Sequence, residues 1–174
     1  LSEDKALNYR FKKDAKGWRV FVSFEHTKPV IHTRQELGAI GIDINVDHIA
    51  LVETDSKGNP IDKCTIPLCT YGKTKDQAKA LIGDAVKTIV SFAKEKSKPI
   101  IREDLDFTYK KRFLKEDTAK RARMLSSFHH SKFIENLESK AFREGVAVYS
   151  VNPAMTSIIG KIKFAYRYGL SIHH

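Results

Sequence analysis

Two acidic residues interrupt stretches that otherwise have the composition of apolar strands. Asp43 lies within the apolar run Ile40–Ile44, and Glu103 closes the short apolar run that begins at Pro99. Because burying an unpaired carboxylate costs several kcal/mol, each acid must lie at an open strand end, pair with a cation or bind a metal. Two strands that deliver carboxylates to one sheet edge suit Mg²⁺ or Mn²⁺. Two such ions, about 4 Å apart, can position water and stabilise the leaving oxygen in phosphodiester cleavage.

The same acids also have a plainer interpretation. Asp43 could cap a turn before Asn45, and Glu103 and Asp104 could be surface acids that follow a strand. The spacing of the residues leaves both interpretations open.

The charge of the chain is unevenly distributed. Its 174 residues include 31 Lys and Arg against 21 Asp and Glu, a net charge of +10. Between Phe107 and Lys132 a cluster of basic residues is opposed by only two acids, Glu116 and Asp117. Aromatic residues are interleaved with the basic ones, and this pattern predicts a nucleic-acid-binding segment. The alternative is a solvated helical face with core aromatics. The basic residues are Lys110, Lys111, Arg112, Lys115, Lys120, Arg121, Arg123 and Lys132.

Hydrophobic periodicity predicts an α/β fold. Two strands around the turn at residues 14–17 form a hairpin, and a second block follows from Gly38 with the order β-β-β-α-β-α-β. Tight connections make its first three strands antiparallel, and helical connections make the later strands parallel to the first. We therefore expect a mixed five-stranded sheet flanked by helices. The expected strands are 39–44, 48–54, 61–67, 99–105 and 146–151, and the expected helices are 73–96 and 131–143.

Three stretches carry a family resemblance. Gly41–Val46, followed by His48–Ala50 and Ser56–Gly58, resembles the first RuvC motif of OrfB-type insertion-sequence proteins (TnpB), relatives of the type V CRISPR effector nucleases. Ile100–Leu105 resembles the second RuvC motif, a strand ending in Glu-Asp-Leu. Val151–Ser157 resembles the Val-x-Pro and Thr-Ser stretch that follows the next strand.

The resemblance also implies a domain organisation. The hairpin around Gly17 and Trp18 resembles the end of the wedge domain that precedes RuvC in this family. Residues 1–37 are then the C-terminal end of a wedge-like β domain, whose beginning we expect to precede Leu1. Residues 38–174 are then a RuvC-like domain with an RNase H-like fold.

The resemblance implies a metal-dependent nuclease that acts on DNA and is guided by a transposon-encoded RNA. Asp43 matches the first metal-binding aspartate of the family and Glu103 the metal-binding glutamate, so both are candidate catalytic and metal-binding residues for Mg²⁺ or Mn²⁺. Asp104 is a structural residue in this interpretation, because adjacent strand residues point to opposite faces.

Two family features are not visible in the sequence. The zinc ribbon with two cysteine pairs is absent after Ser157, so we expect no structural zinc. The third acidic motif is also absent, and His173 could replace its aspartate, since histidine can bind metal or carry a proton. Alternatively, the site is degenerate, the acid lies beyond this sequence, or the terminal histidines are a tag remnant.

Two functions therefore compete. The first is an endonuclease with DNA and a guide RNA as partners. The second is a catalytically degenerate module that binds nucleic acid or acts as a regulator. Because no run of about 20 apolar residues and no signal peptide is visible, we expect a cytoplasmic protein without a membrane partner. The oligomeric state is not predictable from these features.

Overall fold

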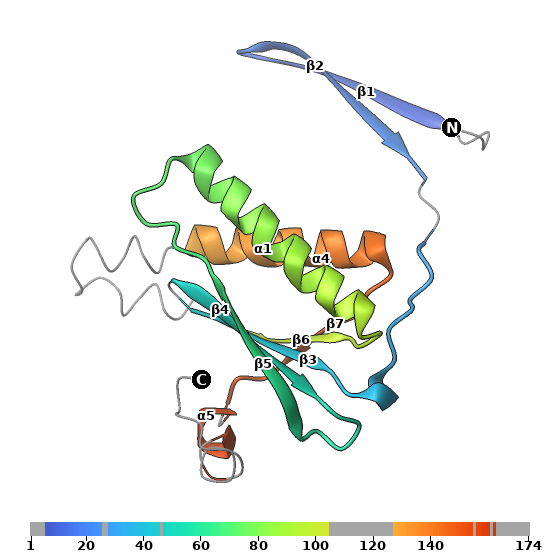
Figure 1. The fold of residues 1–174 in the computed structure, drawn as a ribbon. Helices are drawn as coiled ribbons and strands as arrows, with labels where there is room; N and C mark the ends of the chain where they lie inside the picture. The colour runs from blue at the N-terminus through green and yellow to red at the C-terminus, as the bar shows by residue number, and fades with distance from the viewer. Residues whose placement is uncertain are drawn as a thin grey trace. The chain divides into compact units, whose positions relative to one another are not determined.

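The computed structural model describes residues 6–25, 28–45, 47–104, 127–154, 156–160 and 162. The chain forms two compact units, Leu1–Val30 and Ile31–His174. Figure 1 shows both along the chain. The second unit begins before the expected boundary at Gly38, because the segment leading into its sheet is hydrogen-bonded to it. The amide of His32 donates to the carbonyl of Gly145 (2.8 Å), and the amide of Arg34 donates to the carbonyl of Ser97 (2.9 Å).

The first unit contains an antiparallel hairpin, β1 (Leu7–Asp14) and β2 (Gly17–Phe24). Gly17 has φ 115° in the turn, a conformation that favours glycine. The register gives the hairpin one apolar face, and two strands alone provide nothing to cover such a face. The side chains on this apolar face are exposed. The alternating pattern of β2 had predicted that its apolar side chains would be half-buried. The exposed side chains are Leu7, Tyr9, Phe11, Trp18, Val20, Val22 and Phe24.

The second unit contains the predicted five-stranded sheet. Its strands are β3 (Ile40–Ile44), β4 (His48–Thr54), β5 (Pro60–Pro67), β6 (Ile100–Glu103) and β7 (Val148–Val151). The order across the sheet is β5-β4-β3-β6-β7. The β3–β4 and β4–β5 pairs are antiparallel, whereas β6 is parallel to both β3 and β7. The mixed sheet and the directions of its strands are those predicted, and the first strand of the sheet, β3, lies at its centre.

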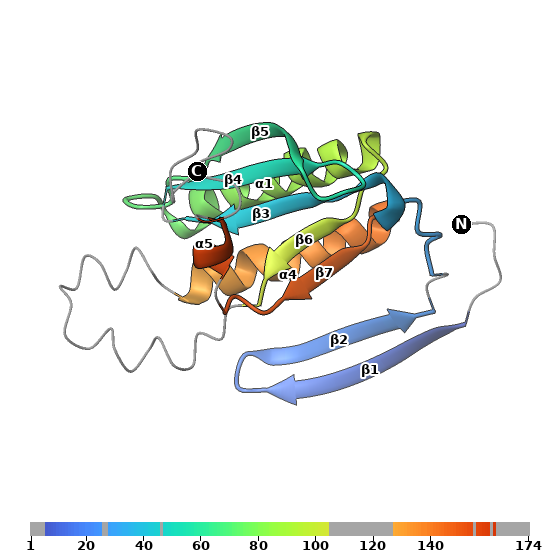
Figure 2. The ribbon, with the colours of Figure 1, turned by 90° about the horizontal axis from the view of Figure 1, so that it is seen from below.

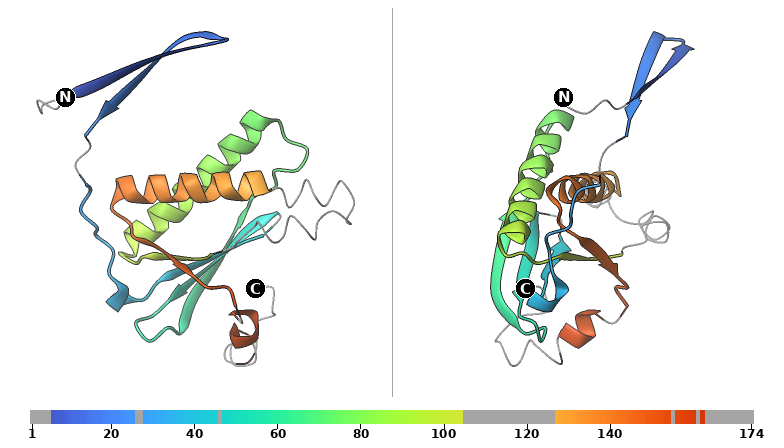
Figure 3. Two further views of the ribbon diagram at one scale, coloured as in Figure 1. Left: turned by 180° about the vertical axis from the view of Figure 1, so that it is seen from behind. Right: turned by 90° about the vertical axis from the view of Figure 1, so that its right-hand side faces the viewer.

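Helices α1 (Lys75–Glu95) and α4 (Ser127–Glu144) cover one face of this sheet and contact each other (Figures 1 and 3). Helix α1 begins with a capping box. The Thr74 hydroxyl accepts a hydrogen bond from the backbone amide of Gln77, and the Gln77 side-chain oxygen accepts one from the backbone amide of Thr74. Viewed from below, the short helix α5 (Thr156–Ile159) lies on the side of the sheet away from both longer helices (Figure 2). A 3₁₀ turn, η1 (Gln35–Leu37), precedes β3.

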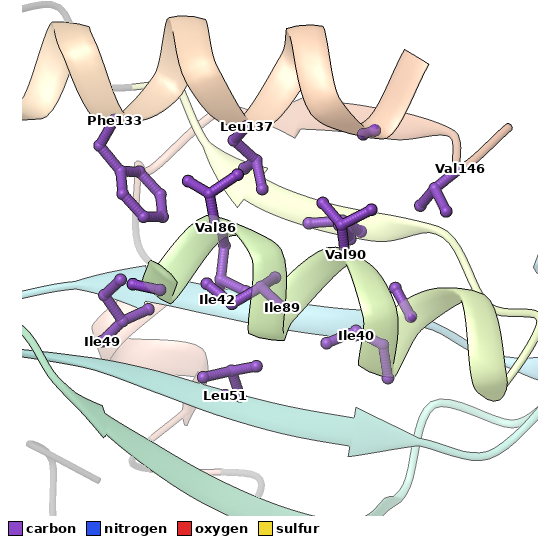
Figure 4. Packing of buried hydrophobic residues seen from close by; sticks show 14 of the residues in the cluster. Ile40, Ile42, Ile49, Leu51, Val86, Ile89, Val90, Phe133, Leu137 and Val146 are labelled. Carbon is purple, nitrogen blue, oxygen red and sulfur yellow. The ribbon is translucent and has the colours of Figure 1, made fainter. Parts of the chain in front are cut away.

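The hydrophobic core lies between the sheet and these two helices. Every second residue of β3 and β4 faces it, which explains why Ile40 and Leu51 are buried. Figure 4 shows these strand residues packed against Val86, Ile89 and Val90 of α1, with Phe133 and Leu137 of α4. The described part of the chain has no helix long and apolar enough to cross a membrane.

The structure shortens the last predicted strand. Residues 146–151 were expected to be extended, but β7 begins at Val148. The amide of Val146 donates to the carbonyl of Ala141 (2.9 Å), and Gly145 has φ 69°. Val146 therefore completes the C-terminal cap of α4 before the chain can enter the sheet.

A buried ion pair lies at the end of the sheet where β4 finishes. Lys98 donates to a carboxylate oxygen of Glu53 (2.5 Å) and to the carbonyl of Thr54 (2.7 Å), and both charged residues are buried. Gly38 packs beside them with φ 102°, so close that a Cβ there would overlap the Thr54 carbonyl oxygen. This end of the sheet is therefore closed by contacts within the chain.

Candidate metal site at the end of the central strands

Asp43 and Glu103 each follow the last residue pair of the parallel β3–β6 ladder. The β3–β6 ladder pairs Ile40 with Ile100 and Ile42 with Arg102, and the next step of this register is Asp43 beside Glu103. Neighbouring strands are about 5 Å apart, and directly adjacent residues point to the same face. That face is the one turned away from the core, since Ile40 and Ile42 alternate with Asp43. Continued by one residue, the register of the two strands would place the two carboxylates that the sequence singled out on the same face.

Asp43 is exposed, and two of its neighbours on its face are small. Across β4 it is paired with Ala50, and Gly41 lies two residues before it on the same face. The Asn45 side-chain amide donates to one carboxylate oxygen of Asp43 (3.2 Å). This bond orients the carboxylate, and neither Gly41 nor Ala50 adds a large side chain beside it.

The peptide unit after Glu103 is held on both sides. The Arg102 guanidinium donates to the Glu103 carbonyl (3.2 Å), and the Asp104 amide donates to the carbonyl of Val151 on β7 (2.8 Å). The half-buried Glu103 is the last residue of β6. The strand end that carries this carboxylate is therefore a defined part of the sheet.

Asp104 points away from the face that carries Glu103, as predicted. Its carboxylate lies 3.8 Å from the Arg102 guanidinium, which itself reaches Glu138 of α4 on the helix-covered side. Asp104 therefore balances Arg102.

His48 is a residue on the candidate face to which the sequence analysis gave no role. It alternates with the buried Ile49 on β4, so it shares the face of Asp43 and Ala50. Its Nδ1 lies 2.6 Å from a carboxylate oxygen of Asp47, and the hydrogen bond with His48 lowers the pKa of Asp47 below its usual value. The alternation of buried and outward-facing residues along β4, which begins at His48, is the sequence pattern that could have placed it on this face.

The donor chemistry of the pair Asp43 and Glu103 fits a hard divalent cation. Mg²⁺ is commonly held by one or two carboxylates, with water and substrate phosphates completing its shell. Within the described residues, no group of three or more His, Cys, Asp or Glu side chains is arranged to hold a metal. Asp43 and Glu103 would hold such a cation together with water and substrate phosphate.

Several predicted site residues lie outside the described residues. They are the basic residues Lys110, Lys111, Arg112, Lys115, Lys120, Arg121 and Arg123, and the candidate third ligand His173. Lys132, the last basic residue of the cluster, lies on α4 and pairs with Glu135 (2.9 Å). The roles of the basic cluster and of His173 stay predictions.

Comparisons with known proteins give the following similarities. No protein-family model and no curated protein matches the chain. Among solved structures, the chain is similar to Thermus thermophilus RuvC in complex with a Holliday junction substrate, with 14% identity, a TM-score of 0.46 and coverage of 74% of this chain and 71% of that one. A second Thermus thermophilus RuvC structure is 18% identical, with a TM-score of 0.44 and coverage of 70% and 66%. At these identities the similarity concerns the fold and assigns no role to any residue of this chain.

Proposed function

We propose that this chain carries a nuclease domain that cleaves phosphodiester bonds in DNA with two divalent metal ions, held by Asp43 and Glu103. The observation that supports it is the parallel register of β3 and β6, whose continuation beyond Ile42 and Arg102 leads to Asp43 and Glu103 on the face turned away from the core. Carboxylates gathered on a solvated face, beside small residues, suit a cation and a phosphate.

The chain's own residues have distinct roles in this proposal. Bound Mg²⁺ or Mn²⁺ would neutralise phosphate charge and activate water. Asn45 holds the Asp43 carboxylate in one orientation through its amide (3.2 Å). Gly41 and Ala50 keep the neighbouring surface free of bulky side chains. The basic cluster at residues 107–132 would neutralise the nucleic-acid backbone.

The finer proposal is an RNA-guided, transposon-associated endonuclease. It is supported by the resemblance of the segments around Asp43 and Glu103 to the RuvC motifs of OrfB-type proteins. Its partners would be DNA and a guide RNA, in the cytoplasm of a prokaryotic cell. His173 remains its candidate for the third metal-binding position.

The test is Mn²⁺-dependent cleavage of single-stranded DNA by the wild type and by Asp43→Ala. We expect the substitution to abolish cleavage while leaving the fold intact, because Asp43 is exposed. Asp62→Ala is a matched control, since Asp62 is an exposed strand acid on β5. Equal cleavage by the wild type and Asp43→Ala would remove the enzyme assignment from this site.

A second candidate is a degenerate module that binds nucleic acid without cutting it. It is favoured by one observation: the described residues supply two strand carboxylates but no three-ligand cluster. This candidate predicts DNA or RNA binding that needs no divalent metal and weakens steeply with salt. Salt-dependent binding by Asp43→Ala equal to that of the wild type, with no cleavage by either, would favour it.

A further inference from the structure

Arg102 joins helix α4 to the strand end that carries Glu103. One terminal nitrogen of its guanidinium donates to the Glu138 carboxylate on α4 (2.8 Å). The other donates to the backbone carbonyl of Glu103 (3.2 Å) and lies 3.8 Å from the Asp104 carboxylate. A single planar group therefore contacts the helix and the last residue of the strand.

The environment of Arg102 suits this two-sided contact. Its side chain is only 16% exposed, whereas that of Glu138 is 50% exposed. Its Nε is buried and has no hydrogen-bond partner in the described part of the chain. The contacts of Arg102 are thus concentrated on its two terminal nitrogens. A lysine ammonium is a single point charge and cannot reproduce this fork.

The contact acts on the backbone that orients Glu103. The carbonyl of Glu103 and the amide of Asp104 belong to one planar peptide unit. Arg102 holds the carbonyl, and Val151 accepts from the amide (2.8 Å). Fixing this plane restricts the backbone torsion of Glu103 and so the direction of its side chain.

We propose that Arg102 is a positioning residue for the candidate metal site: it orients Glu103 by clamping the Glu103 carbonyl against α4. The proposal rests on the proposed function, because it requires Glu103 to hold a metal. It goes further by giving α4, through Glu138, control over the geometry of a metal-binding carboxylate.

The test measures Mn²⁺ affinity of the full chain by the electron paramagnetic resonance signal of free Mn²⁺. We expect Arg102→Gln to weaken binding about tenfold or more, the effect typical of residues that orient metal ligands. Mn²⁺ binding by Arg102→Lys should also be weak, because a lysine cannot make both contacts. Glu138→Gln should cause a smaller loss, since the contact with the Glu103 carbonyl is retained.

Glu135→Gln is the matched control. Glu135 lies on the same helix and pairs with Lys132 (2.9 Å), and within the described residues it forms no ion pair with β6. Its Mn²⁺ affinity should equal that of the wild type. Circular dichroism at the assay temperature verifies that each variant is folded. If Arg102 had a purely structural role, its substitution would lower the melting temperature without changing the Mn²⁺ affinity of the folded protein.

The outcomes separate this inference from the proposed function. Wild-type affinity in folded Arg102→Gln would overturn the role of Arg102; if that variant does not fold, wild-type affinity in Arg102→Lys would do so. Asp43→Ala must lose Mn²⁺ binding in the same experiment. If Asp43→Ala binds as tightly as the wild type, or the wild type does not bind, the proposed function fails and the inference with it.

Discussion

Two strand carboxylates at opposite ends of the β3–β4 pair have opposite environments. Glu53, opposite Ile40, faces the core, is 6% exposed and contacts Lys98 at 2.5 Å and Lys96 at 3.5 Å. Asp43 faces away from the core, is exposed and accepts a hydrogen bond from the neutral side-chain amide of Asn45. No lysine or arginine of the described residues forms an ion pair with Asp43.

The difference follows from the cost of removing a charge from water. A buried carboxylate is tolerated only when a cation and hydrogen bonds compensate it, and the chain supplies both to Glu53. A solvated carboxylate needs no internal partner, so the fold does not require Asp43 to be acidic. We therefore expect Glu53 to matter for stability and Asp43 for binding a cation from outside the chain.

The largest expected effect is at the buried end. Glu53→Gln should lower the free energy of unfolding by about 3–5 kcal/mol, because it leaves the Lys98 ammonium buried without its counter-charge. Urea denaturation measures the change. The double variant Glu53→Met, Lys98→Met should recover most of the loss, since it removes both charges. A loss below about 1 kcal/mol in the single variant would contradict the structural role of the pair.

The glycine beside this ion pair should be the next most sensitive position. Gly38→Ala should cost about 2–4 kcal/mol, because a Cβ would combine a strained φ of 102° with overlap of the Thr54 carbonyl. Gly58→Ala is the control, with φ 77° and open space around the added carbon, and should cost about 1 kcal/mol. Equal losses in urea denaturation would mean that the close approach at Gly38 has no energetic weight.

The exposed end should respond to metal. Mn²⁺ at 100 times its dissociation constant should stabilise the wild type by about 2.7 kcal/mol, by mass action on the folded state. Asp43→Asn should lose this stabilisation, yet its metal-free stability should stay within about 0.5 kcal/mol of the wild type. Thermal unfolding with and without Mn²⁺ measures both quantities. Equal Mn²⁺ stabilisation of the variant would separate Asp43 from metal binding.

The smallest expected effect concerns a partly exposed, paired carboxylate. Hydrogen bonds from Lys140 and then Lys94 lower the pKa of Glu144 from 4.5 to about 2. Because the folded-state pKa is depressed, this contribution to stability is present above pH 4.5 and is lost as the pH falls towards 2. Urea denaturation between pH 6 and 3 should show a slightly shallower pH dependence for Glu144→Gln than for the wild type. Raising the salt concentration should reduce the difference between them, because exposed pairs are screened.

Much of the fold was predictable from local patterns. The alternation that begins at His48 predicted β4 with its observed bounds, and the three- and four-residue spacing predicted α1 to within two residues at each end. Helix α4 begins at Ser127, before the predicted start at 131, because the residues ahead of the periodic stretch carried no recognisable start signal. Alternation and helical spacing are set by residues close together in the sequence, so a single segment is enough to recognise them.

The candidate site was predictable only in part. Two carboxylates at strand ends could be recognised as unusual, and the resemblance named Asp43 and Glu103 as a pair. The contacts of Arg102 could not be predicted, since Glu138 is 36 residues away and nothing in the local pattern couples them. The same holds for Lys98 and Glu53, which are 45 residues apart.

The sequence by itself determined the hairpin, the five strands and the two long helices, the direction of successive strands and the presence of acids near the ends of two of them, but not the 3₁₀ turn η1 or the short helix α5. Hydrophobic periodicity, turn residues and connection lengths are local properties, so they can be recognised from the sequence alone. Only the tertiary structure decided which carboxylate is buried with a lysine and which is left in solvent. That choice depends on the register between strands far apart in sequence, because shifting a strand by one residue turns every side chain to the other face of the sheet.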